Sequence, residues 1–272
     1  MLRRNSAQQE KPRRLAVLLP MSIARLIITC LIVIVSIGKV DFALTVSGAP
    51  TQSVSQATTS LTVEDTREAE ERLSELGYWT GPVDGKLDEG SRHALIAFQK
   101  VEGRQRTGKL GPGELEALRA ATRPKPIEGG FAHIELDLAR QVLFVVDASW
   151  TVSKILPVST GTGKLFTEGG RTRRAITPRG RFTVYRKING WRRSPLGSLY
   201  YPSYIYGGIA IHGSPSVPPY PASQGCIRIP MFAARQFSEM TPIGTVVIIH
   251  DGAPVIDEAG GRDAGDRLQR QR

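Results

Sequence analysis

The hydrophobic pattern of this chain changes its period at one short segment, residues 123–130. The segment contains two prolines and two glycines, which interrupt regular secondary structure, so we expect a linker there. In residues 61–122 apolar side chains recur at the spacing of an α-helix, whereas in residues 131–252 they alternate along short runs. The sequence therefore predicts a small all-α domain followed by a mostly β domain.

Three short helices are predicted before the linker. The first covers residues 66–76 and is ended by Gly77, because glycine readily adopts the left-handed conformation that follows many helices. The second is predicted around residues 91–101, and a shorter third helix over residues 113–121. These helices form a compact three-helix unit.

Short runs rich in β-branched and aromatic residues follow the linker. They predict strands over residues 134–137, 142–147, 152–158, 181–186, 209–212 and 245–250. Residues 231–240 are predicted as the one helix of this domain. Many short strands with a single helix favour a β-sandwich or an open barrel.

The two ends of the chain have a different composition. Residues 1–14 form a basic leader before an apolar stretch, residues 15–38, which we interpret as a signal anchor, with a cleaved signal peptide as the alternative. Residues 39–60 predict a flexible linker, and residues 253–272 a disordered tail. The basic leader should stay in the cytoplasm, so the folded part is expected on the extracytoplasmic side of the membrane.

The net charge of +11 and the isoelectric point near 10.0 require an explanation. Nucleic acid is the first partner to consider for such a chain. The basic residues, however, are not interleaved with a nucleic-acid-binding signature, and much of the excess lies in the leader and in residues 171–193. The latter run contains no acidic residue and could attract an anionic partner, an ordinary solvated face being the alternative, and no nucleic-acid partner is predicted.

Cys226 is one of two cysteines, and the other, Cys30, falls within the apolar stretch, so a disulfide between them is not expected. His212 lies upstream of Cys226 across a proline-rich loop. The thiolate is the reactive form of cysteine, and His212 could act as the base that lowers the pKa of Cys226. The pair indicates a nucleophilic site, although a buried apolar cysteine and a core histidine remain alternatives.

Several motifs surround this pair in a fixed order. His212-Gly213 and Ser223-Gln224-Gly225-Cys226-Ile227-Arg228 are preceded by Ser159-Thr160-Gly161 and Thr177-Pro178-Arg179-Gly180-Arg181-Phe182. Over about residues 132–250 the chain thereby resembles the YkuD-type L,D-transpeptidases of bacterial cell walls. That family usually reads Ser-His-Gly-Cys, whereas this chain has Gln224 in place of the histidine.

The helical segment carries a second resemblance. Gly77-Tyr78-Trp79, Val83-Asp84-Gly85, Phe98-Gln99 and Thr107-Gly108 resemble the small three-helix peptidoglycan-binding domain. Residues 86–90 depart from the glycine-rich form that is usual there. Trp79 and Phe98 fit the core of such a domain equally well.

The first resemblance implies a mechanism without a metal or other cofactor. Cys226 would attack a peptidoglycan stem tetrapeptide and form a thioester, and an amine of a neighbouring stem would then complete a 3-3 cross-link. His212 would move the protons, and the carbonyl of Gly213 would orient its ring. The amides of Gly225 and Cys226 would form the oxyanion hole. Donor and acceptor stem peptides are the expected partners, and carbapenem-type compounds the expected inhibitors.

The remaining motif positions are assigned to substrate binding. Ser223 and Arg228 occupy family positions, with Arg228 expected either to pair with a carboxylate or to lie in a surface ion pair. Tyr206 is assigned to the donor groove, an aromatic core residue being the alternative. Gln224 could donate its side-chain amide to the donor peptide.

Three other functions fit parts of the same pattern. An L,D-carboxypeptidase would use the same residues with water as the acceptor. A non-catalytic wall-binding anchor would follow if Gln224 marked a decayed site. A cysteine protease is disfavoured, because no orienting Asn or Asp motif accompanies the cysteine and histidine and the chain is rich in strands.

Overall fold

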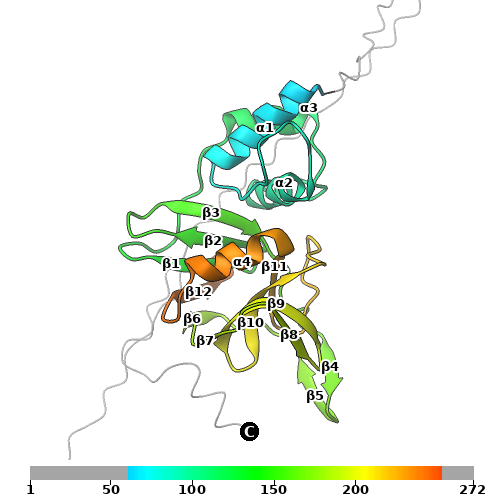
Figure 1. Ribbon diagram of the computed structural model, residues 1–272, viewed down its shortest axis with the longest axis vertical. Helices are drawn as coiled ribbons and strands as arrows, with labels where there is room; N and C mark the ends of the chain where they lie inside the picture. The colour runs from blue at the N-terminus through cyan, green and yellow to red at the C-terminus, as the bar shows by residue number, and fades with distance from the viewer. Residues whose placement is uncertain (1–60, 253–272) are drawn as a thin grey trace, which may run out of the picture. The chain divides into compact units, whose positions relative to one another are not determined.

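The structure, a computed structural model, describes residues 61–252 (Figure 1). The predicted leader, signal anchor, flexible linker and C-terminal tail lie outside the described residues. Within the described range, no helix is both long and apolar enough to cross a bilayer. The predicted order, a helical segment followed by a mostly β domain with one helix, is confirmed.

The three predicted N-terminal helices are present as α1 (Val63–Glu75), α2 (Glu89–Val101) and α3 (Pro112–Ala120). Helix α1 begins earlier than the hydrophobic pattern predicts, because Thr62 and Asp65 form a capping box. Helix α2 also begins earlier, because the Asp88 side chain accepts a hydrogen bond from the amide of Ser91 at 2.8 Å. Local caps therefore extend both helices beyond their apolar faces.

One buried carboxylate, that of Glu70 on α1, holds the turn between α1 and α2. It accepts hydrogen bonds from the amides of Asp84 at 3.0 Å and Gly85 at 2.8 Å, and from the hydroxyl of Ser91 at 2.6 Å. Gly85 has a φ of 80°, which glycine adopts without strain. The charge of Glu70 is thus compensated by three donors that fix the turn to both helices.

The first sheet has the strand order β3-β2-β1-β12-β6, and β1 and β12 form its parallel pair. Its strands are β1 (His133–Asp137), β2 (Val142–Val146), β3 (Val152–Pro157), β6 (Gly180–Thr183) and β12 (Val246–His250). Every residue of β1 and β2 is buried, so other parts of the chain cover both faces of this sheet.

The second sheet has the order β11-β10-β9-β7, and β8 also pairs with β9. Its strands are β7 (Arg186–Lys187), β8 (Trp191–Ser194), β9 (Gly197–Tyr206), β10 (Ile209–Ser214) and β11 (Ile227–Pro230). The predicted helix follows β11 as α4 (Met231–Met240), and a separate hairpin is formed by β4 (Leu165–Glu168) and β5 (Arg171–Arg174). The sequence did not predict β4, β5, β8, β9 or β11, and it predicted one strand over residues 181–186 where the structure has β6 and β7.

Two hydrophobic cores lie on opposite sides of strand β2. Leu143 and Val145 point into the main core, which the two sheets and α4 share. Phe144 and its neighbours of the same parity point into a second core with helices α1, α2 and α3. Backbone hydrogen bonding also joins the helical segment to the first sheet, because the Trp79 amide donates to the Ile155 carbonyl of β3 at 3.0 Å. The helical segment therefore shares a core with the sheet.

We predict that Ile155→Ala destabilises the helices and the sheet together. Ile155 is fully buried in the shared core, so removing its side chain should cost about 2 to 5 kcal/mol of unfolding free energy. Urea unfolding followed by helical circular dichroism and by tryptophan fluorescence should show one common, shifted transition. Ile243→Ala, at a side chain that is 65% exposed, is the control and should change stability by less than about 0.5 kcal/mol. Two separate transitions would contradict the shared core.

Candidate active site

His212 lies on β10 of the second sheet, and Cys226 directly precedes the neighbouring strand β11. Strands β10 and β11 are parallel, with Ile211 opposite Ile227 and both isoleucines buried in the main core. Cys226 directly precedes Ile227 and His212 directly follows Ile211. Because side chains alternate along a strand, Cys226 and His212 both project from the face opposite the main core.

The ring of His212 is held by the carbonyl that follows it. Its Nδ1 lies 2.9 Å from the Gly213 oxygen, and since a carbonyl only accepts, Nδ1 carries the proton and Nε2 is left as the acceptor. His212 is 6% exposed, and this burial lowers its pKa to about 4, opposed by the Gly213 contact and assisted by the charge of Arg228. The imidazole is therefore neutral at physiological pH.

Gly213 is a glycine because helix α4 packs directly against it. A Cβ at this position would lie 2.6 Å from the Cβ of Ala234 on α4. The close approach of α4 to β10 thereby fixes the backbone whose carbonyl orients His212.

Cys226 is a partly buried free thiol. Its Sγ lies 3.7 Å from the carbonyl oxygen of Gly208, and no hydrogen bond joins it to His212 in the described chain. Burial raises the pKa of Cys226, while the Ala210 amide and the charge of Arg228 oppose this shift. The expectation that His212 lowers the pKa of this thiol is wrong, because a neutral imidazole supplies no charge to stabilise a thiolate. The resting pair is a neutral thiol and a neutral imidazole.

Arg228 lies opposite His212 in the strand register, and its side chain is half-buried. Its backbone is fixed by two hydrogen bonds with Ser159, at 3.1 and 3.0 Å. Among residues 61–252 no carboxylate forms an ion pair with its guanidinium, so the expected surface ion pair is absent there. Its charge favours the thiolate of Cys226 and disfavours protonation of His212.

The loop before Cys226 is held by the hydroxyl of Ser223. This hydroxyl accepts a hydrogen bond from the Gly225 amide at 3.0 Å and donates to the Cys226 carbonyl at 2.5 Å. The Gly225 amide, expected in the oxyanion hole, is therefore already satisfied within the loop, and that assignment is corrected. Ser223 is 2% exposed, so it supports the loop from inside rather than facing a substrate.

Thr177, for which the sequence predicted no role, binds the backbone of two motifs. Its hydroxyl donates to the Gly225 carbonyl at 2.7 Å and accepts from the Gly161 amide at 3.0 Å. Gly161 has no space for a side chain, since a Cβ there would lie 2.3 Å from the Ala175 oxygen. The two upstream motifs are therefore hydrogen-bonded to each other and to the backbone of the loop that precedes Cys226.

Gln224 and Tyr206 are placed differently from each other. Gln224, in the loop before Cys226, is exposed, so its side-chain amide is open to solvent. Tyr206 is half-buried, and its ring lies 5.6 Å from that of Phe182 against the main core. This contact fits the alternative interpretation of Tyr206 as an aromatic packed on the core.

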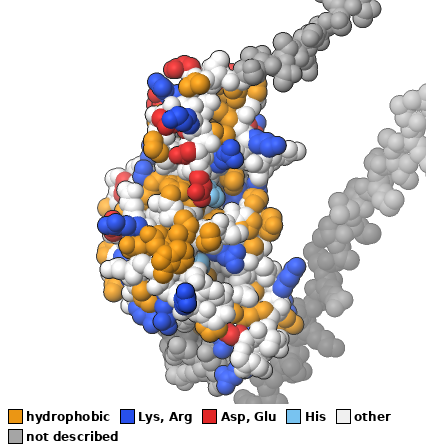
Figure 2. Space-filling view, turned by 45° about the vertical axis from the view of Figure 1, so that its right-hand side comes forward, with side chains coloured by type: hydrophobic (Ala, Val, Ile, Leu, Met, Phe, Trp, Pro, Cys, Tyr) orange, Lys and Arg blue, Asp and Glu red, His pale blue; other side chains and the backbone are white. Residues whose placement is uncertain are grey.

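Exposed basic side chains outnumber acidic ones on strands β5 and β8, and Glu168 on β4 forms an ion pair with Arg173 at 3.8 Å. In the view of Figure 2, acidic side chains are concentrated over the upper, helical part, whereas the lower part carries mainly basic ones. The exposed arginines of β5 and β8 belong to this basic surface; they are Arg171, Arg173, Arg174, Arg192 and Arg193. Such a surface attracts carboxylates and other anions at a distance of about one Debye length.

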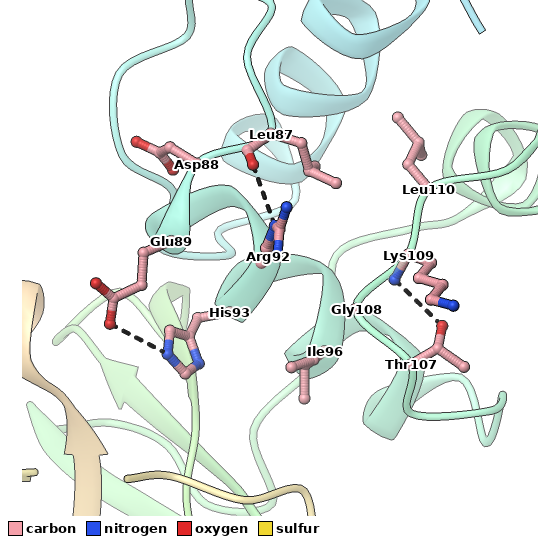
Figure 3. A pocket seen from close by; sticks show the side chains of 10 residues that line it. All are labelled: Leu87, Asp88, Glu89, Arg92, His93, Ile96, Thr107, Gly108, Lys109 and Leu110. Carbon is pink, nitrogen blue, oxygen red and sulfur yellow. Dashed lines mark hydrogen bonds and ion pairs between the residues drawn. The ribbon is translucent and has the colours of Figure 1, made fainter. Parts of the chain in front are cut away.

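A groove of about 860 Å³ lies on the helical segment (Figure 3). It is lined from α2 and from the segment before α3, by Leu87, Asp88, Glu89, Arg92, His93, Ile96, Thr107, Gly108, Lys109 and Leu110. The Nε2 of His93 lies 3.7 Å from Glu89, while its buried Nδ1 has no hydrogen-bond partner in the described range. The groove thus combines apolar walls with charged groups of both signs.

Comparisons with known proteins agree with this architecture. Residues 132–249 match the family YkuD, described as the L,D-transpeptidase catalytic domain, and residues 62–118 match a putative peptidoglycan binding domain. The crystal structure of an L,D-transpeptidase (residues 123–326) from Xylanimonas cellulosilytica DSM 15894 is 38% identical over 68% of this chain and 93% of that chain, with a TM-score of 0.65. The chain belongs to the L,D-transpeptidase family. It is a member with an N-terminal peptidoglycan-binding domain before the catalytic domain.

A second solved structure is more distant. The L,D-transpeptidase (Yku) from Stackebrandtia nassauensis is 22% identical, and the match covers 71% of this chain and 94% of that chain with a TM-score of 0.42. A comparison with curated proteins finds no match.

We predict that Cys226 titrates above the ordinary thiol pKa of about 8.5 in the absence of substrate, because burial raises its pKa and the neutral His212 supplies no compensating charge. The rate of iodoacetamide alkylation against pH, measured in a Cys30→Ser background, should have its midpoint above that value. Arg228→Gln should raise the midpoint further, since it removes a positive charge. Arg235→Gln on the exposed side of α4 is the control and should leave it unchanged. A midpoint below about 8.5 would contradict a neutral resting pair.

Proposed function

We propose that this chain is a peptidoglycan L,D-transpeptidase that forms 3-3 cross-links through a thioester on Cys226. The observation that carries the proposal is the placement of Cys226 and His212 on one face of adjacent parallel strands, with Nδ1 of His212 bound to the Gly213 carbonyl. This arrangement puts the nucleophile and the unprotonated Nε2 on the same face of the sheet.

The first half of the reaction acylates Cys226. Sγ attacks the carbonyl between the third and fourth residues of the donor stem as its proton passes to Nε2 of His212. The C–S bond forms, and the C–N bond breaks as the imidazolium returns that proton to the departing amine of D-alanine. The product is a thioester, which keeps the acyl group activated without ATP.

The second half transfers the acyl group. An amine of the acceptor stem attacks the thioester and loses a proton to His212, the C–N bond forms, and the C–S bond breaks. The proton then returns from His212 to the sulfur, so the neutral resting pair is restored. Because burial holds the pKa of His212 to about 4, the imidazolium exists only while substrate charge develops nearby.

Because the Gly225 amide is bound to Ser223, we place the Cys226 amide in the oxyanion hole. The exposed side-chain amide of Gln224, in the same loop, is assigned to a hydrogen bond that positions the donor peptide. The half-buried guanidinium of Arg228 supports the thiolate that forms during attack and again during release.

An L,D-carboxypeptidase would use the same residues, with water in place of the acceptor amine. The exposed arginines of β5 and β8 favour transfer to a second stem, because a basic surface raises the local concentration of stem carboxylates. Products from a stem tetrapeptide, separated by mass, distinguish a cross-linked dimer from a shortened tripeptide. A chain that only binds the wall would yield neither product.

The folded part acts in the cell wall or periplasm in this proposal, with residues 15–38 as its membrane anchor. The peptidoglycan-binding domain and the catalytic domain both require access to the wall, which supports this location. The groove on α2 is our candidate for the wall-binding surface, since its apolar walls and charged rim suit sugar rings and stem carboxylates (Figure 3).

We predict that a carbapenem forms a mass adduct on Cys226 of the wild-type protein and that Cys226→Ala and His212→Ala abolish it. Gln224→Ala should slow acylation by about tenfold at most, because it removes one hydrogen bond worth about 0.5 to 1.5 kcal/mol. Gln224→His should remain active. If the wild type forms no adduct while Gln224→His does, His212 is not the base and a wall-binding anchor replaces the enzyme.

We predict that Arg92→Glu in the α2 groove weakens peptidoglycan binding by about tenfold to a hundredfold, since a charged hydrogen bond contributes about 1.5 to 3 kcal/mol. Co-sedimentation with purified peptidoglycan at moderate salt measures the effect, in a Cys226→Ala background that excludes covalent attachment. Arg67→Glu, exposed on α1 outside the groove, is the matched control. Equal losses for both variants would reduce the binding to non-specific charge attraction.

A further inference from the structure

Lys100, on helix α2 of the peptidoglycan-binding domain, carries a charged group inside the molecule. It is 1% exposed, and its Nζ donates to the carbonyl oxygens of Gln141 and Val158, each at 2.9 Å. Both carbonyls belong to the catalytic domain, Gln141 directly before β2 and Val158 directly after β3. Among the described residues no carboxylate forms an ion pair with Lys100.

A buried lysine without a carboxylate is costly, so the two carbonyls are its compensation. Burial lowers the pKa of Lys100 to about 7, and the positive charge of Arg106 adds to this effect. An ammonium has three donors and a neutral amine two, so both carbonyls stay bound in either protonation state. The contact therefore persists across physiological pH.

Gln141 carries this contact toward the active site. It is 2% exposed and has a φ of 61°, which side chains other than glycine rarely adopt. Its side-chain oxygen accepts from the Thr160 amide at 3.0 Å, and its side-chain nitrogen donates to the Thr160 hydroxyl at 2.8 Å. Lys100 thus binds the backbone carbonyl of Gln141, and the side chain of Gln141 holds Thr160 by two hydrogen bonds.

Thr160 in turn holds the cysteine loop. Its carbonyl accepts hydrogen bonds from the amides of Ala222 and Ser223, each at 2.9 Å. The Ser223 hydroxyl then binds the Gly225 amide and the Cys226 carbonyl. A continuous series of hydrogen bonds, from Lys100 through Gln141, Thr160 and Ser223, therefore ends on the backbone of the nucleophile.

We propose that Lys100 is a positioning residue for Cys226: the peptidoglycan-binding domain supplies, through Gln141 and Thr160, part of the hydrogen bonding that places the nucleophile for acylation. The inference rests on the proposed function, because it assumes that Cys226 is acylated. Without the ammonium, the buried carbonyl of Val158 loses its donor and the segment carrying Thr160 shifts to regain one. A shift well below 1 Å at the nucleophile is enough to slow an attack that requires aligned atoms.

The test is the carbapenem acylation rate of Lys100→Met in the full chain. Methionine is close to lysine in length and flexible, so it fills the space without donating. We expect the maximal acylation rate constant to fall about tenfold or more, while the carbapenem concentration at half-maximal rate stays within about twofold. A residue that only stabilises the fold would leave both constants unchanged in a fully folded sample, which circular dichroism well below the unfolding temperature establishes.

Lys86→Met is the matched control, because Lys86 is exposed on the turn before α2. In this variant the carbapenem should acylate Cys226 at the wild-type rate. Gln141→Met and the double variant Lys100→Met/Gln141→Met test whether the effect of Lys100 on Cys226 passes through Gln141. If Lys100 acts through Gln141, the double variant is no slower than Gln141→Met alone. Additive losses, or a folded Lys100→Met that acylates at the wild-type rate, overturn the proposal.

Thr160→Val serves if Lys100→Met does not fold. It removes only the hydroxyl that accepts from Gln141 and keeps the side-chain shape. A slower acylation with unchanged half-saturation supports the series of hydrogen bonds, and an unchanged rate overturns it. Absence of acylation in the wild type is a different result, since it removes the proposed function itself.

Discussion

Burial of strand β2 on both faces is the constraint on which the rest of the described chain depends. Its odd and even residues pack into two different cores, one between the sheets and one beneath the helices. A strand with two apolar faces is unstable unless both are covered. The helices therefore complete the sheet, and the sheet fixes the ends of β2 and β3, from which the support of the active site begins.

The active site itself is organised by backbone groups more than by side chains that face a substrate. The Ser223 hydroxyl binds the Gly225 amide, and the Thr177 hydroxyl binds the Gly225 carbonyl. The Gly213 carbonyl binds Nδ1 of His212. Each bond removes an alternative conformation or tautomer. The groups that our proposal uses are the thiol and the amide of Cys226, Nε2 of His212 and the exposed side-chain amide of Gln224.

Much of this arrangement could be predicted from the sequence, because periodicity and motif order are local properties. The helical segment, the edges of most strands and the candidate pair Cys226 and His212 follow from them. Strand β9 was missed because Pro202 and several polar residues hide its alternation, and β5 because all its side chains are exposed. The roles of Gln141 and Thr177 depend on contacts between distant segments, and a raised pKa depends on burial, so neither has a local signal.

The neutral state of the resting thiol has a consequence for the lifetime of the protein. Oxidants attack the thiolate far faster than the thiol, and compartments outside the cytoplasm lack the reducing systems that repair a sulfenic acid. By raising the pKa of Cys226, burial keeps this sulfur in its less oxidisable form between turnovers. In the reaction and location that we propose, the low polarity around Cys226 makes the nucleophile depend on His212 for each attack and also protects it from oxidants.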